Sequence, residues 1–268
     1  MKKTSDLLRQ SVVLVSAILA IVGSFIGSGA AGGTPVQNAS NGALAADATP
    51  IAPDGPAFGI WTVIYLGLIA YASWQFLPAQ RTDDRQRALG YPVAASLILN
   101  AAWILSIQFD LLWLSVPVIV LLLVVLIRAF QVTLLSRPKN RIEMVVADGT
   151  VGLYLGWVAI ATAANVTAVL VASGFEGFGF GADLWAVLIL AAAGLVGVIL
   201  ALYGHGRLAP AVSLCWGLAW VAVARLTGNL LSTPAAIAAI VAVAAILIVT
   251  ITVRVRTTRS DTPRLVTA

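Results

Sequence analysis

Eight long runs of mostly apolar residues divide this chain, and they constrain its fold more than any other feature. A helix of roughly 20 such residues spans the hydrocarbon core of a bilayer. Apolar residues make up 60% of the 268 positions and charged residues only 10%, which is more apolar surface than one soluble core needs. We therefore predict an all-α, polytopic membrane helix bundle. Its spans are expected at about 10–31, 57–77, 91–109, 113–135, 147–172, 184–203, 208–226 and 234–253.

The basic residues indicate how these spans are oriented. If the N-terminus is cytoplasmic, all but one of the 16 basic residues fall on the cytoplasmic side, and only Arg225 falls outside. The positive-inside rule describes this asymmetry. We therefore predict a multi-pass protein with both termini cytoplasmic, in a plasma membrane that we expect to be bacterial. The same distribution explains the net charge of +5 without a nucleic-acid partner, because no basic patch is interleaved with aromatic residues.

The first apolar run has two interpretations. Basic residues, an apolar core and then small residues are typical of a cleaved signal peptide, which would remove about residues 1–31. A long apolar core that carries Gly23 and Gly27 four residues apart favours a retained helix packed closely on another. We expect retention and keep cleavage as the alternative. At the other end, residues 254–268 form a basic tail that is expected to face lipid headgroups.

Polar residues recur at one depth in several spans. Counting about 1.5 Å per residue from the outer span ends places Tyr65, Asn100, Trp103 and Asn165 roughly 10–15 Å below the outer surface. Asn100 and Trp103 share a helix face, because residues three apart are neighbours on a helix. An unpaired amide in hydrocarbon is costly, so both asparagines should face protein, water or ligand. We expect these four side chains to converge in one layer of the outer half of the bundle.

Two interpretations of this layer are open. The asparagines could simply join neighbouring helices by hydrogen bonds, which is common in membrane bundles. Trp61, Trp113 and Trp185 could likewise belong to the aromatic belts at the membrane interfaces. Trp103 and Trp157 lie too deep for a belt, and indole walls with a few amides suit a flat, largely apolar ligand.

Three motifs resemble those of the TspO/translocator protein family, also called tryptophan-rich sensory proteins. The stretch "FGIWTVIYLGLIAYASWQ" is similar to the second-helix pattern W-x-x-x-Y, and "LILNAAWILSIQF" to the third-helix pattern L-N-x-x-W. The stretch "LYLGWVAIATAANV" is similar to the fifth-helix pattern Y-L-x-W-x-x-x-A-T-x-x-N, and Trp113 resembles the tryptophan that opens the fourth helix. By matching position, the residues implied for ligand binding are Trp61, Asn100, Trp103, Trp113, Trp157, Ala161 and Asn165, to which the depth argument adds Tyr65.

The resemblance covers about residues 10–172. It implies a five-helix core that binds porphyrins, sterol-like or other hydrophobic molecules in a cavity between its helices, frequently within homodimers. We accordingly divide the chain into a ligand-binding core (1–172), three additional transmembrane helices (173–253) and a basic cytoplasmic tail (254–268). The family's first loop usually carries W-Y and K-P-x-W-x-P-P, whereas this loop offers only "IAPDGPAFGIW". Porphyrin breakdown attributed to that loop is therefore not expected.

The function predicted is binding of a flat hydrophobic molecule by a sensor, carrier or transporter. The alternative is a small permease for another solute, which would place charged residues within the spans; Asp148, Arg128 and Arg225 lie near span ends. A retinal protein needs a lysine in a late helix, and none is there. One cysteine and one histidine rule out cysteine or histidine metal clusters, and no nucleophile–base pair is evident. We expect no enzyme, no cofactor and no metal.

Overall fold

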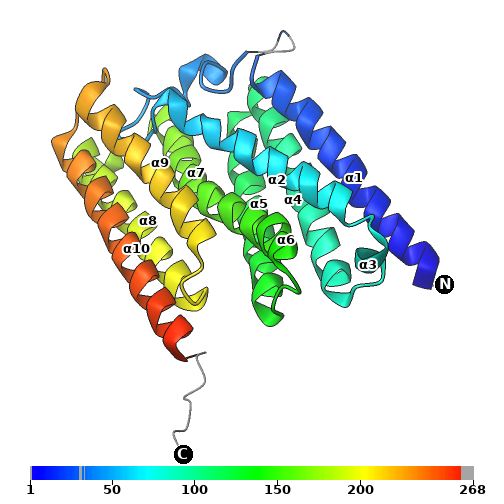
Figure 1. Cartoon of the computed structure of the whole chain (residues 1–268). Coiled ribbons are helices and arrows are strands. Elements are labelled where there is room, and N and C mark those ends of the chain that lie inside the picture. Colours follow the sequence, from blue (N-terminus) through cyan, green and yellow to red (C-terminus); the bar gives the residue numbers. More distant parts are fainter. Residues whose placement is uncertain (1, 30–31, 33, 261–268) are drawn as a thin grey trace, which may run out of the picture.

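The computed structural model describes residues 2–29, 32 and 34–260, and within these it contains helices and no strand. Eight helices are long and apolar enough to cross a bilayer, and they lie side by side as a bundle (Figure 1). The predicted all-α, polytopic membrane fold is confirmed. The long helices are α1 (Lys2–Gly27), α2 (Ile60–Trp74), α4 (Asp84–Gln108), α5 (Leu112–Leu135), α7 (Thr150–Ala172), α8 (Ala182–Tyr203), α9 (Leu208–Thr227) and α10 (Thr233–Ser260).

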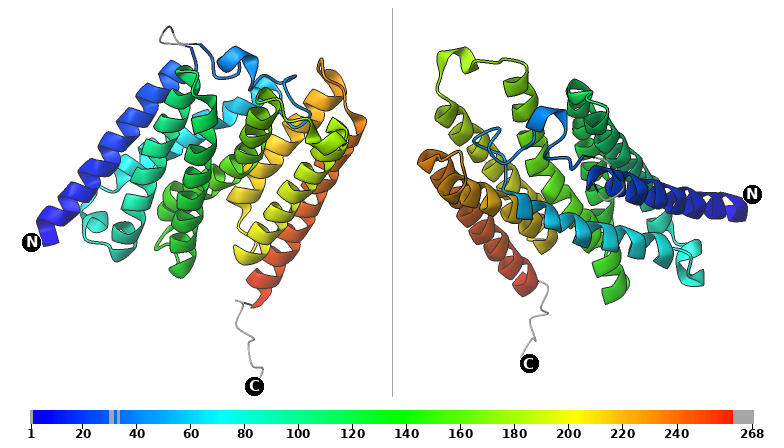
Figure 2. Two further views of the ribbon diagram at one scale, coloured as in Figure 1. Left: turned by 180° about the vertical axis from the view of Figure 1, so that it is seen from behind. Right: turned by 90° about the horizontal axis from the view of Figure 1, so that it is seen from above.

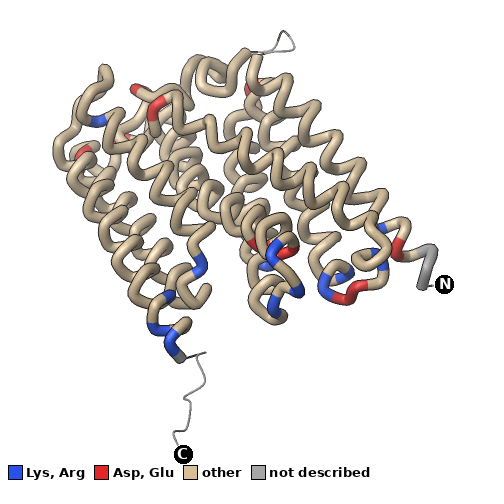
Figure 3. The backbone as a smooth tube through the Cα atoms, viewed as in Figure 1, with Lys and Arg blue, Asp and Glu red and all other residues tan. Residues whose placement is uncertain are grey.

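The two ends of the bundle differ. At one end, which we call the loop end, residues 34–59 and 173–181 cross over the helices. Most Lys and Arg residues lie at the opposite end, which we call the basic end (Figure 3). Helix α1 begins and α10 ends at the basic end; its cytoplasmic location stays a prediction. The short elements are η1 (Ser40–Gly42), η2 (Gly55–Gly59), α3 (Pro78–Arg81), α6 (Arg141–Glu143), the π-helical η3 (Met144–Gly149) and η4 (Gly177–Gly179).

Large apolar side chains point outward from the long helices. Leu66 on α2, Leu195 on α8 and Ile248 on α10 are each at least 60% exposed. Water would make such a surface an aggregation hazard, whereas lipid matches it. The outward faces are therefore those of a multi-pass membrane protein.

Glycines bring α1 close to α4. A Cβ built on Gly23 would contact the Ala101 Cβ at 3.5 Å, and one built on Gly27 would lie 2.7 Å from Ile104. The small-residue face predicted from Gly23 and Gly27 thus packs within the chain. Residues 30, 31 and 33 of the small-residue segment after this helix, and 261–268 of the basic tail, lie outside the described residues.

Helix α7 lies between the first helices and the last three (Figure 2), and α9 is the helix that packs against it most extensively. Gly152 allows this contact, because an added Cβ would lie 2.8 Å from Ala209. One turn later, an added Cβ at Gly156 would overlap the carbonyl oxygen of Pro210. Helices α8 and α10 pack mainly on each other and on α9. The two glycines of α7 therefore join α8–α10 to the rest of the bundle.

Candidate functional site

An aromatic cluster lines the interior between α2 and α7. Trp61 stacks on Tyr65, one helical turn further along α2, with ring centroids 5.3 Å apart. The Trp61 ring meets Tyr154 and Trp157 edge to face, with centroids 5.7 and 6.3 Å apart respectively. Phe58 meets Trp157 in the same way, with centroids 5.8 Å apart. Offset and edge-to-face geometries are those that aromatic pairs prefer. The cluster forms a rigid wall of rings within the bundle.

Hydrogen bonds cross the bundle beside this wall. The Asn100 amide donates to the Tyr65 hydroxyl over 2.6 Å, which links α4 to α2. The Trp103 indole donates to the Asn165 carbonyl oxygen over 3.1 Å, and the Asn165 amide donates to the Ser115 hydroxyl over 2.9 Å. Asn100 and Asn165 are each only 1% exposed. The four side chains expected to converge are thus paired as Tyr65 with Asn100 and Trp103 with Asn165, and these bonds also join the helices.

Two adjoining cavities lie against the rings and amides. The deeper one has a volume of about 20 Å³ and the upper one a volume of about 50 Å³. The shared wall consists of Phe58, Trp103, Trp157 and Ala161. The deeper cavity adds Trp61, Asn100, Ile119, Leu122 and Val158, and the upper one adds Asn165, Ile160, Ala164, Ala168 and the loop residues Val36, Ala43, Leu44, Thr49, Ala52 and Pro53.

A wider hollow of about 690 Å³ lies at the loop end. It shares Ala43, Thr49 and Ala168 with the upper cavity, and Asn41 and Asp110 give it a more polar lining. The three spaces therefore adjoin one another through shared lining residues, from the loop end to the indoles.

Two buried polar atoms at the deeper cavity have no hydrogen-bond partner. They are the Asn100 side-chain oxygen, an acceptor, and the Trp157 indole nitrogen, a donor. Both side chains line the cavity. A buried polar group left unpaired costs about 1–3 kcal/mol, so such groups are uncommon and need an explanation. This cavity offers one unused donor and one unused acceptor.

Six of the eight predicted residues line the cavities, and two do not. Tyr65 lies outside the cavity wall as the partner of Asn100. Trp113 is 66% exposed on α5 and does not line either cavity. Its position is that of an interfacial belt residue, whereas Ser115, two residues further on in α5, points inward to Asn165. The predicted residues that line the cavities are Trp61, Asn100, Trp103, Trp157, Ala161 and Asn165.

Sequence reasoning missed several contributors to this site. Tyr154 and Phe58 stood in the quoted motifs, but no spacing rule distinguished them from core residues. Ser115 could have been found as a hydroxyl within an apolar run. The loop residues carry no signal, since small apolar side chains such as Ala43 and Ala52 become cavity walls only when the loop folds over the helices.

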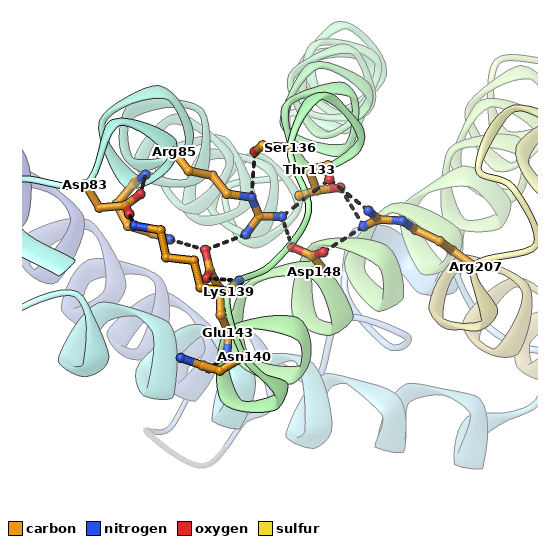
Figure 4. Close-up of polar contacts among 10 residues, drawn as sticks. Asp83, Arg85, Thr133, Ser136, Lys139, Asn140, Glu143, Asp148 and Arg207 are labelled. Atoms are coloured by element: carbon orange, nitrogen blue, oxygen red, sulfur yellow. Dashed lines mark hydrogen bonds and ion pairs between the residues drawn. The ribbon is translucent and has the colours of Figure 1, made fainter. Parts of the chain in front are cut away.

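A charge network lies at the basic end (Figure 4). Arg85 on α4 donates to Glu143 over 2.7 Å and also to Asp148. The second Asp148 oxygen accepts from Arg207, which precedes α9, over 2.9 Å. Both guanidinium groups also donate to the carbonyl oxygen of Thr133 near the end of α5. We call Arg85, Glu143, Asp148 and Arg207 the charge network. With the Thr133 carbonyl group it connects α4, α5, α6, the turn η3 that leads into α7, and the start of α9.

The π-helical turn η3 carries Asp148 into this network. Beside it, outside the spans, Lys139 pairs with Asp83. Burial raises the pKa of the Asp83 carboxyl, but the Lys139 ammonium and the backbone N–H of Gln86 outweigh it and hold that pKa below its ordinary 3.8. Among the described residues no cluster of His, Cys, Asp and Glu could hold a metal ion.

These features define a multi-pass membrane protein with an aromatic-walled cavity among its first five spans. The chain belongs to the TSPO-like protein family, whose model matches residues 12–253. No curated protein and no solved structure gives a significant match. The family match extends beyond the 10–172 covered by the resemblance found in the motifs, so α8 and α9 and most of α10 lie within the matched region.

Proposed function

We propose that the protein binds a flat, largely apolar molecule, of the porphyrin or sterol-like class, in the indole-walled cavity. The supporting observation is the unused donor on Trp157 and the unused acceptor on Asn100 at one aromatic wall. Ring faces stack on a flat ligand, while a few polar atoms fix its orientation. The protein would then act as a membrane sensor, carrier or transporter for that molecule.

Binding requires the cavity to open. A ligand pocket usually has roughly 300–1,000 Å³, far more than the present 20 and 50 Å³. The roof is the loop 34–59, whose buried Ala39, Ile51 and Ala57 pack into the hydrophobic core and which also makes polar contacts with the helices. The Ser40 hydroxyl donates to Ile107 over 3.2 Å, the Gln108 amide donates to Thr34 over 2.6 Å, and Arg225 donates to Ala46. We expect the ligand to enter at the loop end by displacing this loop.

The proposed role is non-catalytic and needs no cofactor, since binding involves no bond-making step. The homodimer implied by the family resemblance stays a proposal. Gly152 and Gly156 are already used against α9 within the chain, so a dimer would use another helix face.

Transport of another solute is the second candidate, and the charge network favours it. Arg85, Glu143 and Asp148 are at most 8% exposed within the spans, and buried charges often mark transport pathways. Their charges are paired with one another at the basic end, away from the cavity. A permease would show uptake of a polar solute by proteoliposomes that Asp148→Asn abolishes, whereas a hydrophobic-ligand protein would not.

The decisive test is a titration of the purified full-length protein with protoporphyrin IX, followed by porphyrin absorbance. We expect saturable binding. Trp157→Phe keeps an aromatic ring but removes the indole donor, so the dissociation constant should rise about tenfold, the effect of roughly 1.4 kcal/mol.

Trp113→Phe is the matched control, because Trp113 is exposed and outside the cavity. It should leave the dissociation constant unchanged. Equal affinities of the two variants, or binding that never saturates, would refute the proposed site. A circular dichroism melt of each variant checks that the bundle is intact.

A further inference from the structure

A second, larger hollow lies on the opposite side of α7 from the indoles. It is a groove between α7 and α8 with a volume of about 770 Å³. Its walls combine alanines with larger aliphatic side chains. The alanines include Ala159 and Ala163 on α7 and Ala186 and Ala192 on α8, and Leu214 of α9 contributes to the lining. Helices α7 and α8 follow each other in the chain but contact each other little. The groove is large enough for a ligand without any movement of the protein.

The groove has the length of one lipid leaflet. Its walls run from Ala159 to Val171 on α7 and from Ala182 to Val196 on α8. At about 1.5 Å per residue these segments are roughly 18 and 21 Å long, against about 15 Å for half of the hydrocarbon core. The groove therefore reaches from the loop end to slightly beyond the middle of the membrane.

The groove has no fully buried hydrogen-bonding atom left unpaired among its described side chains. Its Thr167 hydroxyl lies on a half-buried residue, and its Glu176 carboxylate is exposed at the loop end. The Thr162 hydroxyl donates to the Val158 carbonyl over 2.7 Å, within its own helix. The Trp185 indole donates to the Gly177 carbonyl over 3.0 Å. None of the buried, unpartnered side-chain atoms belongs to a residue that lines the groove. The deeper cavity, with its free donor and acceptor, is different in this respect.

The lack of buried, unpaired polar atoms in the groove favours an apolar ligand over a polar one. A porphyrin carries carboxylates and ring nitrogens, and polar groups buried without partners are costly. A saturated hydrocarbon chain needs no partners and gains dispersion contacts with the alanine, valine, leucine and isoleucine side chains that line the groove. At the loop end the groove is bordered by Phe175, Glu176 and Phe180, and aromatic side chains favour the headgroup level of a bilayer.

We propose that the groove between α7 and α8 binds one acyl chain of a phospholipid from the leaflet at the loop end. The headgroup lies beside residues 175–180, and the chain fills the space that α7 and α8 leave between them. This lipid site is separate from the indole-walled cavity and does not rest on the function proposed for that cavity.

The test uses the full-length protein in phosphatidylcholine vesicles that contain a phosphatidylcholine with a photoactivatable diazirine on one acyl chain. After illumination, labelled residues are mapped by peptide mass spectrometry. We expect strong labelling of residues 159–171, whose groove face the chain contacts. Ala192→Phe fills the groove and should reduce that labelling about tenfold, because lost methylene contacts weaken binding steeply.

Ala191→Phe is the matched control, since Ala191 is the adjacent, exposed residue that does not line the groove. It should leave the labelling of 159–171 unchanged. Ala163→Phe fills the groove from the α7 side and should act like Ala192→Phe, which guards against a folding defect of either variant. Equal labelling in Ala191→Phe and Ala192→Phe overturns the proposal. So does the absence of label on 159–171 while the outward face of α10 is labelled, because the groove is then closed or covered by a second copy.

Discussion

The indole-walled cavity and the charge network bury polar side chains to a similar extent but use them differently. Asn100 is 1% exposed and Asp148 is 6% exposed. Each Asp148 carboxylate oxygen accepts a hydrogen bond from a guanidinium group. The Asn100 side-chain nitrogen donates a hydrogen bond, but its side-chain oxygen has no partner. Polar groups whose hydrogen bonds are all satisfied within the protein hold helices together. A buried polar group without a partner suits a site where a ligand supplies the missing hydrogen bond.

The charge network also connects helices that the hydrogen bonds at the cavity do not connect. Arg207 brings the start of α9 to Asp148, and Arg85 brings α4 to the same carboxylate. Removing one member of a buried ionic group leaves the other charges uncompensated, which costs more than the group contributes as a whole. We therefore expect the two regions to respond to substitution with very different magnitudes.

The largest effect should come from Asp148→Leu. It leaves Arg85 and Arg207 without their shared carboxylate, so the free energy of unfolding should fall by about 3–5 kcal/mol. Reversible unfolding in mixed detergent micelles measures this. Asp84→Ala is the control, because the Asp84 side chain is 93% exposed in its pair with Arg87, and exposed pairs contribute at most about 1 kcal/mol. Comparable losses in the two variants would show that the charge network is not a structural joint.

A smaller fall in the free energy of unfolding is expected for Gly156→Ala, at the contact between α7 and α9. The added methyl group would overlap the carbonyl oxygen of Pro210, and overpacking of this kind costs about 1–3 kcal/mol. The same unfolding measurement applies. Gly59→Ala serves as the comparison, because nothing lies within 4 Å of a Cβ added there. If Gly156→Ala is as stable as Gly59→Ala, α9 does not pack on α7 as closely as described.

Asn165→Leu should cost about 1 kcal/mol, since hydrogen bonds between membrane helices are modest. It removes the acceptor of the Trp103 indole and the donor to the Ser115 hydroxyl, which keeps its own bond to the Leu112 carbonyl. It should also weaken porphyrin binding. Thr162→Val provides the reference, because that hydroxyl bonds only within its own helix. If Asn165→Leu lowered the free energy of unfolding as much as Asp148→Leu, the hydrogen bonds at the cavity would be as important for stability as the charge network.

The smallest effect concerns the Lys139–Asp83 pair at the edge of the charge network. The Asp83 carboxylate raises the pKa of Lys139 above its ordinary 10.5, so that contribution is lost only as the pH rises above that range. The lowered pKa of Asp83 means that its contribution is lost only as the pH falls below 3.8. The small stability loss in Lys139→Met should therefore be constant between about pH 5 and 9. A loss that varies within this window, measured by urea unfolding at several pH values, would contradict the pairing.

Periodicity and depth predicted part of the candidate site. Counting residues along the spans placed Tyr65, Asn100, Trp103 and Asn165 in one layer, because a helix converts sequence position into height at a fixed rise. The pairing of Tyr65 with Asn100 and of Trp103 with Asn165 came only from the structure. The same counting could not place Trp113. Its depth near the interface is correct for a belt residue and for a cavity residue alike, and only the rotation of α5 decides which way its ring points.

The charge network was only partly visible in the sequence. Asp148 stood near a span end, but its partners lie 63 and 59 residues away in the chain. The π-helical turn that carries Asp148 has no sequence signal of its own. Similarly, the four-residue spacing of Gly152 and Gly156 is typical of close helix contact, but only the structure identifies α9 as the helix that makes it.

The sequence by itself determined that this chain is a membrane protein with eight spans, because the cost of exposing backbone and polar groups to lipid leaves little freedom in reading an apolar run. Tertiary structure decided everything that depends on how those helices rotate and approach one another. It turned the Asn100 amide to Tyr65, turned Trp113 outward, and set α8 apart from α7 with a groove between them. Lipid treats all apolar helix faces alike, so only packing between particular faces distinguishes a cavity wall from a lipid-facing surface.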